Sequence, residues 1–129
     1  MASAVTVRFG GLVIGSADPQ RLSAWYHAAL APDSEPGDVL GRPVVEVGGA
    51  RLVFDKRADV ADATTEPGRI LINLFTPDIQ GAAAHLEGFD VRWVRPVETL
   101  PDFGSVGTFT DPDGNYVQLL SPAGPPAGA

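Results

Sequence analysis

The same succession of elements occurs twice along the chain, and this internal repeat limits the possible folds more than any other feature. In each half, a short strand leads into a helix that begins after an aspartate N-cap, Asp18 in the first half and Asp78 in the second. The two caps lie 60 residues apart, and β-rich segments follow both helices. The repeat therefore predicts an α+β fold made of two similar modules.

In the first half, residues 9–15 predict a strand in which Gly11 and Val13 share one face. The helix that follows is expected to end before Pro32. Its residues at the spacing of one buried stripe are Leu22, Trp25, Tyr26, Ala29 and Leu30. After a Pro- and Gly-bearing acidic loop, the runs PVVEVGG and RLVFDKR meet at a Gly-Gly dipeptide, which predicts a β-hairpin.

The second half repeats this order. It opens with a strand that places Ile70, Ile72 and Leu74 on one face. The helix after Asp78 again carries apolar residues at helical spacing, and Gly88 lies near its end. Later strands are predicted in VRWVRPV and in the segments GTFT and NYVQLL.

The segment DPDGN, residues 111–115, predicts a type I turn, because Asp, Pro and Gly occupy its first, second and fourth positions. This turn sets the register of the final strand, which contains Gln118. Matching the last strands of the two halves pairs Gln118 with Val53, 65 residues apart, so the second module carries about five additional residues. Residues 97–107 are the expected place for them, as a loop that is either a lid or a solvated connector.

Length and composition limit the domain count and exclude several chemistries. With 129 residues, 44% of them hydrophobic, we expect one domain over residues 1–122, with modules at about 5–57 and 69–122 and a disordered tail at 123–129. The absence of cysteine excludes disulfides, thiolate nucleophiles and cysteine-ligated metals. The net charge of −7 argues against a nucleic-acid partner. No apolar run is long enough to span a membrane, so we expect a cytoplasmic protein.

Together, the two tandem β-α-β-β-β units, the SADPQRLSAWYHAAL passage and the DPDGNYVQLL ending resemble the vicinal oxygen chelate superfamily. That superfamily includes glyoxalase I, extradiol dioxygenases and bleomycin-resistance proteins. The resemblance extends from about Arg8 to Pro122. It implies the glyoxalase/bleomycin-resistance fold, in which two modules form a cup-shaped mixed sheet around a pocket with the helices outside. It also implies a homodimer.

The resemblance further implies where a metal ion would bind, because metal-using members carry His, Gln or Glu at concave positions of the first and last strands. The corresponding positions here are Gly11, Leu71, Val53 and Gln118. Three of these side chains cannot bind a metal, and the amide of Gln118 is a weak, neutral ligand where catalytic members typically have Glu. We therefore expect no metal and no other cofactor.

Other candidate ligands do not supply a metal site. His27 and His85 fall on the two helices, which the resemblance places outside the cup, so both are expected to be surface or interface residues. The acidic segment of residues 111–115 does not fit a calcium loop, because its Gly and its twelfth residue stand at the wrong positions.

Alternation along the strands predicts which side chains line the pocket. They are Gly11, Val13, Leu71, Asn73 and Phe75 from the first strands, and Arg51, Val53, Asp55, Tyr116, Gln118 and Leu120 from the last strands. This lining is mostly apolar with few polar groups, as in small-molecule sites. The amides of Asn73 and Gln118 either bind carbonyl, hydroxyl or amide groups of a ligand, or bond to each other or to water. Gly11 either admits a close approach of ligand or backbone or marks a bulge.

Aromatic side chains extend this prediction. Trp93, Phe103 and Tyr116 are candidates to stack on a flat ligand, with packing in the core or in a dimer as the alternative. Arg92 and Arg95, which flank Trp93, either hold an anionic group or are solvated.

We consider four functions for these residues, and we favour a metal-free protein that binds a hydrophobic or aromatic small molecule. The alternative is a metal-independent isomerase, cyclase or lyase of the same fold. In it, Asp55 would be the general base and Asn73 or Gln118 would polarise a carbonyl. A metal-dependent glyoxalase or dioxygenase conflicts with the ligand positions, and a structural dimer with a vestigial pocket stays open. The sequence leaves open which ligand binds, whether there is turnover and how a dimer is arranged.

Overall fold

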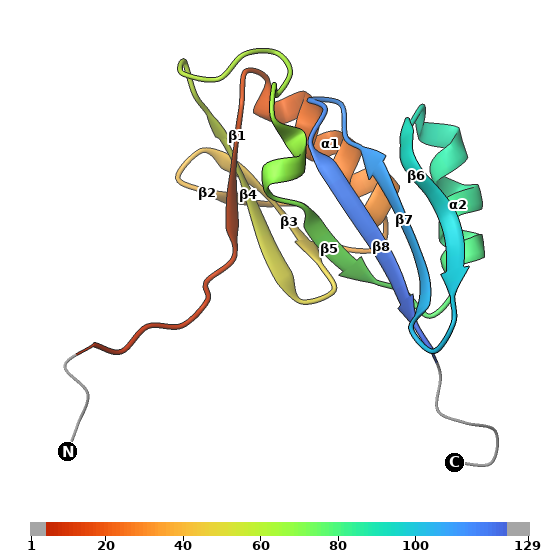
Figure 1. Ribbon diagram of the computed structural model, residues 1–129. Coiled ribbons are helices and arrows are strands. Elements are labelled where there is room, and N and C mark those ends of the chain that lie inside the picture. The colour runs from red at the N-terminus through yellow and green to blue at the C-terminus, as the bar shows by residue number, and fades with distance from the viewer. Residues whose placement is uncertain (1–4, 124–129) are drawn as a thin grey trace. The chain divides into compact units, whose positions relative to one another are not determined.

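The computed structural model describes residues 5–123, which form two compact units divided after Arg57 (Figure 1). We call the residues up to Arg57 unit 1 and those from Ala58 onward unit 2. Each unit contains one four-stranded mixed sheet and one α-helix, which confirms the predicted α+β class and the repeated module. Of the predicted disordered tail, residues 124–129 lie outside the described residues.

Unit 1 has the order strand, helix, and three strands. Its elements are β1 (Leu12–Ser16), α1 (Pro19–Leu30), β2 (Gly37–Val39), β3 (Arg42–Val47) and β4 (Ala50–Lys56). The strand order in the sheet is β1-β4-β3-β2, with β1 parallel to β4 and the other pairs antiparallel. The Gly48-Gly49 hairpin is confirmed, since both glycines have positive φ, as a tight two-residue turn requires.

Unit 2 repeats this topology. Its elements are η1 (Pro67–Arg69), β5 (Ile72–Phe75), α2 (Ile79–Leu86), η2 (Glu87–Phe89), β6 (Trp93–Leu100), β7 (Gly104–Thr110) and β8 (Tyr116–Pro122). The strand order is β5-β8-β7-β6, and β5 is parallel to β8. The backbone N–H of Gly114 donates to the Asp111 carbonyl at 2.9 Å, which confirms the predicted turn between β7 and β8.

Both predicted N-caps are present, and the repeat extends to the residue two positions before each cap. Asp18 and Asp78 accept a hydrogen bond from the backbone N–H three residues later, at 3.2 and 3.0 Å. The backbone N–H groups of these caps donate to Ser16 Oγ and Thr76 Oγ1, at 3.0 and 3.3 Å. Both helices therefore begin with the same pair of N-cap hydrogen bonds.

The core of unit 1 lies between α1 and one face of its sheet. Leu22, Tyr26 and Ala29 of the predicted stripe are buried, and the ring of Tyr26 lies 5.2 Å from that of Phe54 on β4. Burial of side chains of this size stabilises a fold by roughly 1.5–3 kcal/mol each. Trp25 and Leu30 complete the stripe but are only partly buried. In unit 2, α2 packs on β6 and β8 (Figure 1).

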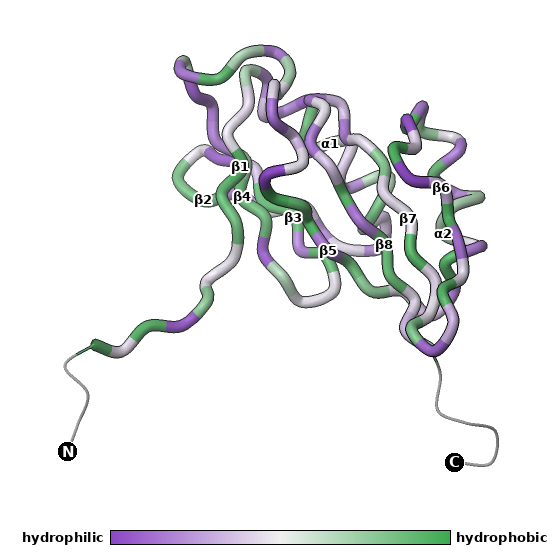
Figure 2. The backbone as a smooth tube through the Cα atoms, in the orientation of Figure 1, coloured by the Kyte–Doolittle hydropathy of each residue, from purple (hydrophilic) through white to green (hydrophobic). Residues whose placement is uncertain are grey.

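Three strand boundaries differ from the prediction. The first strand begins at Leu12, where pairing with Leu52 of β4 starts, because the preceding Gly11 has a φ of 123°, which is not an extended strand conformation. Residues 5–10 therefore form no strand, although hydrophobic and hydrophilic residues alternate there too (Figure 2). Likewise, β5 begins at Ile72, so Ile70 is outside the strand and exposed. Finally, β2 is a short edge strand within the segment predicted as an acidic loop.

The prediction of a loop at residues 97–107 was wrong. These residues form the ends of β6 and β7 and the short turn between them, because Glu98 pairs with Val106 and Leu100 with Gly104. The additional residues of the second module do lie here. Eight positions separate Glu98 from Val106, whereas three separate the matching pair, Val39 and Arg42, in unit 1. The extra five residues lengthen a paired hairpin and form no irregular loop.

Among the described residues, neither helix has the length and apolar character needed to cross a membrane.

Candidate functional site

In each unit the helix covers one face of the sheet, and we call the opposite face the helix-free face. Alternation along β4 defines it in unit 1, since Leu52 and Phe54 are buried toward α1 while Val53 and Asp55 are partly exposed. In unit 2, Val117 and Leu119 are buried, while Gln118 and its alternate neighbours are partly exposed. Most of the side chains predicted to line a pocket belong to these two faces.

On the helix-free face of unit 2, residues form rows across the strands. Pairing between neighbouring strands places the central row as Asn73, Gln118, Thr108 and Arg95. Beside it runs a second row of Phe75, Leu120, Val106 and Glu98. On the other side, Tyr116 pairs with Thr110, and Leu71 lies one residue before β5. The predicted Leu71, Asn73, Phe75, Tyr116, Gln118 and Leu120 are thus brought together.

The amides of Asn73 and Gln118 bond to each other. Gln118 Nε2 donates to Asn73 Oδ1 at 2.9 Å, across the parallel pair β5 and β8. The bond leaves the Asn73 amide nitrogen as a donor and the Gln118 amide oxygen as an acceptor. Phe75, 70% exposed, is next to this pair on β5. The face therefore offers apolar surface with a small, uncharged polar centre.

The side chains at the positions that the resemblance assigns to metal ligands are poor ligands. Of these four positions, Gly11, Leu71 and Val53 offer no ligand atom in their side chains. The Gln118 oxygen is a single neutral ligand. Within residues 5–123, no three His, Asp or Glu side chains are grouped to hold a metal ion.

The helix-free face of unit 1 has the reverse pattern, apolar in the middle and charged at its sides. Its central row consists of Val13, Val53, Val44 and Gly37. Arg51 pairs with Glu46 on one side, and on the other side lie Gly15, Asp55 and Arg42. An ideal Cβ on Gly11 would lie 2.5 Å from the Arg51 carbonyl oxygen, so a close backbone approach, and no ligand, accounts for this glycine.

Asp55 is engaged in ion pairs. Its Oδ1 accepts from Arg42 Nε at 2.7 Å, and its Oδ2 lies 3.9 Å from Arg57 Nη1. Both carboxylate oxygens thus face arginine side chains of the same unit, an arrangement typical of a structural ion pair, which disfavours the predicted role of general base.

Two aromatic candidates lie outside these rows. Trp93 packs on the helix side of its sheet, where its ring lies 5.5 Å from that of the buried Phe109 and its Nε1 donates to Glu87 at 2.9 Å. The assignment of Trp93 to a pocket lining is therefore corrected to packing. Phe103 is exposed in the turn between β6 and β7, with its carbonyl bonded to the Ala123 N–H at 2.9 Å. Of the flanking arginines, Arg95 forms an ion pair with Glu98 at 2.7 Å.

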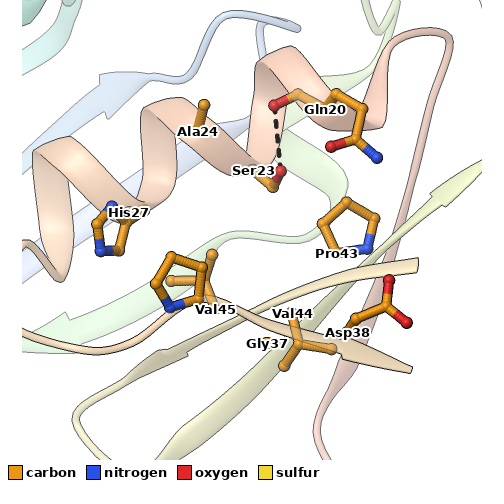
Figure 3. A pocket seen from close by; sticks show the side chains of 10 residues that line it. Gln20, Ser23, Ala24, His27, Gly37, Asp38, Pro43, Val44 and Val45 are labelled. Atoms are coloured by element: carbon orange, nitrogen blue, oxygen red, sulfur yellow. Dashed lines mark hydrogen bonds between the residues drawn. The ribbon is translucent and has the colours of Figure 1, made fainter. Parts of the chain in front are cut away.

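A cavity that the sequence did not predict lies beside α1 in unit 1 (Figure 3). It has a volume of about 330 Å³, and α1 contributes Gln20, Ser23, Ala24 and His27 to one wall. The other walls are Pro36, Gly37, Asp38, Pro43, Val44 and Val45. The predicted site residues are absent from this lining. The sequence feature that could have indicated this cavity is the spacing of Gln20, Ala24 and His27, which places them along one side of the helix.

His27 is held at the rim of this cavity, since its Nε2 lies 2.8 Å from the Ser34 carbonyl oxygen. The hydroxyl of Ser23 donates to the Gln20 carbonyl at 3.1 Å, within the helix (Figure 3). Both polar side chains are thus bound to the backbone of their own unit, and Gln20 and Asp38 are the other polar side chains of the lining.

Solved structures share this fold at low sequence identity. TnmS3, an antibiotic binding protein from Streptomyces sp., is 22% identical with a TM-score of 0.70, and the match covers 95% of this chain and 100% of that one. A glyoxalase/bleomycin resistance protein/dioxygenase from Nocardioides is 14% identical with a TM-score of 0.72, covering 98% and 92%. Lactoylglutathione lyase from Agrobacterium tumefaciens is 14% identical with a TM-score of 0.65, covering 91% and 95%.

The sequence comparison is consistent with the fold. The search of curated proteins gives no match. The family model of the glyoxalase-like domain matches residues 11–120, from the start of β1 into β8. Because this match spans most of the chain, the protein belongs to the glyoxalase-like domain family, within the vicinal oxygen chelate superfamily.

Proposed function

We propose that this protein binds a hydrophobic or aromatic small molecule, without a metal ion, on the helix-free face of unit 2. The observation that carries the proposal is the exposure of Phe75, at 70%, directly beside the Asn73–Gln118 amide pair. Covering apolar surface releases roughly 25 cal/mol per Å², so an apolar ligand on Phe75 and Leu120 gains affinity from burial. The amide pair then orients it.

The amide pair favours ligands with neutral polar groups. One donor at Asn73 and one acceptor at Gln118 match a carbonyl or hydroxyl group on the ligand. Because neither amide carries a charge, the site avoids the desolvation penalty of a buried ion. A mostly apolar surface with a few placed polar groups is the usual composition of a small-molecule site.

Similarity to TnmS3 supports small-molecule binding. That structure is of an antibiotic binding protein, and it shares the fold over 95% of this chain. We therefore extend binding of a small hydrophobic molecule to this protein as a proposal. The enzymatic alternative loses support, because the Asp55 carboxylate that would act as base is paired with Arg42.

The first test is a thermal-shift and calorimetric screen of aromatic and antibiotic-like compounds, which raise the melting temperature if they bind the folded state. Phe75→Ala is expected to weaken binding of any hit by about tenfold or more, as loss of a buried aromatic contact does. The matched control is Leu40→Ala, because Leu40 is 89% exposed in the β2–β3 turn of unit 1. If no compound binds, or if both variants bind equally, the proposed site is wrong.

The absence of a metal ion is tested separately. Elemental analysis of protein purified without a chelator or a polyhistidine tag is expected to find only substoichiometric metal. Added nickel, zinc, manganese or iron(II) is expected to leave the melting temperature unchanged. A tightly held metal ion in every chain would contradict the proposal and favour a metal-dependent enzyme.

A further inference from the structure

The cavity beside α1 in unit 1 shares no residue with the site proposed above. Its volume of about 330 Å³ lies within the range of small-molecule pockets. The buried Ser23 and Val45 lie at its floor, while Gln20, Ala24 and Asp38 are exposed. The cavity is therefore open to solvent, and a small molecule can enter it.

Asp38 gives this cavity a negative charge, because the lining contains no lysine or arginine. Its Oδ1 accepts from the backbone N–H of Gly41 at 2.9 Å, in the turn between β2 and β3, which orients the carboxylate. Its Oδ2 has no hydrogen-bond donor and no ion-pair partner among residues 5–123. The second oxygen is thus available to a ligand.

Gln20 and His27, two further polar side chains of the lining, can accept hydrogen bonds as well. The amide of Gln20 makes no hydrogen bond within the described part of the chain, and its oxygen is an acceptor. A carbonyl only accepts, so His27 Nε2 donates to Ser34, and Nδ1 is the acceptor of the neutral ring. Figure 3 shows Gln20 and Asp38 at one end of the cavity and His27 at the other. The first end therefore offers two oxygens to a donor, and one of them is charged.

These groups match a protonated amine with an apolar body. An ammonium group has three N–H donors and no acceptor, so it can bond to both Asp38 Oδ2 and the Gln20 oxygen. Its bond to the carboxylate is charge-assisted and therefore stronger than a bond between neutral groups. Pro43 and Val45 supply apolar contact for the rest of the ligand. An anion would instead be repelled by Asp38.

We propose that the cavity beside α1 is a second ligand site. It binds a small primary amine through Asp38 and Gln20, with the apolar body of the ligand on Pro43 and Val45. The inference goes beyond the proposed function, because it concerns other residues and a cationic class of ligand.

The test compares benzylamine with benzyl alcohol, which share an aromatic body and differ in charge at neutral pH. Titration of the isotope-labelled full chain, followed by NMR, is expected to shift the backbone signals of Gly37 and Val45. The amine is expected to bind about tenfold more tightly, the size of one charge-assisted hydrogen bond. Asp38→Asn is expected to remove most of this preference, and its amide oxygen can still accept from Gly41. Asp33→Asn, an exposed position outside the lining, is the charge-matched control and is expected to keep the preference.

A gain of affinity provides a second test. Gln20→Glu adds a carboxylate at the same end of the cavity, and it is expected to tighten benzylamine binding about threefold or more while leaving benzyl alcohol binding unchanged. The internal repeat supplies the matched control, Gln80→Glu, because Gln80 is the second residue of α2 as Gln20 is of α1. This control is expected to leave both affinities unchanged.

Several outcomes would contradict the second site. Equal binding of the two probes by the wild type, or binding of neither, would overturn it. A preference that survives in Asp38→Asn, or that is also lost in Asp33→Asn, would rule out direct recognition by Asp38. Signal changes confined to the strands around Gln118 would place benzylamine at the site of the proposed function, and would overturn this inference alone.

Discussion

At the scale of single residues, the carboxylate of Asp111 closes the turn that sets the register of β8. Its Oδ1 accepts from the backbone N–H groups of Asp113 and Asn115, and its Oδ2 from the Asn115 side chain, each at 2.9 Å. Asp111 is itself buried, so these donors have little access to water as a substitute. The position of Gln118 in β8 therefore depends on a side chain several residues away.

Replacing this carboxylate should be strongly destabilising. Asp111→Ala is expected to lower the free energy of unfolding by about 2–3 kcal/mol, because it leaves buried donors unsatisfied. Urea denaturation followed by circular dichroism measures this change. Asp33→Ala, at an exposed loop position, is the control and is expected to stay within about 0.5 kcal/mol of wild type. Equal stability of the two variants would rule out this role for Asp111.

At the scale of elements, the long β6–β7 hairpin carries register shifts that decide which way its side chains point. Shifts lie between Trp93 and Arg95 and between Arg95 and Glu98. A bulge inserts a residue on one strand and breaks the simple alternation of faces. Trp93 consequently packs over Gly107 and against Phe109, on the side covered by α2. Simple alternation would have placed Trp93 on the same face as Arg95, so the sequence pattern alone could not predict the packing of Trp93.

The packing over Gly107 predicts a sensitive position. An added Cβ would lie 2.9 Å from Val97 Cγ2 and 3.1 Å from Trp93 Cζ3, inside a buried layer. Gly107→Ala is therefore expected to destabilise the fold by about 1–3 kcal/mol through overpacking. Gly88→Ala is the control, because an added Cβ there meets no atom within 4 Å. Thermal unfolding that finds Gly107→Ala as stable as Gly88→Ala would contradict this packing.

At the scale of the whole molecule, several large apolar side chains are exposed on the surface of the described residues, among them Val13, Ile70 and Phe75. Exposed apolar surface is reduced when a second copy or a ligand covers it. The resemblance to the superfamily implies a homodimer, and this stays a prediction.

The oligomeric state can be measured directly. A homodimer is expected to have a mass of about 27 kDa in light scattering after size exclusion, twice that of the 13.5 kDa chain. A dilution series separates a stable dimer from weak association. A mass of one chain at all concentrations would exclude the dimer.

The sequence by itself determined the features that depend on neighbours along the chain. The aspartate caps, the Gly48-Gly49 hairpin and the turn at Asp111 follow from local hydrogen bonding and backbone preferences, and all three are present. Spacing alone also located the five extra residues of the second module. Together with the resemblance, these features were enough to identify the repeated module and the class of fold.

Only the tertiary structure decided which distant side chains meet. The bond between Asn73 and Gln118 joins residues 45 positions apart, and the Arg42–Asp55 pair joins residues 13 apart across two strands. Strand register and bulges fix such pairs, and both depend on packing against the rest of the sheet. For this reason the sequence left the bond between the two amides as one of two alternatives. It also could not predict the ion pairs of Asp55 or the packing of Trp93 against Phe109.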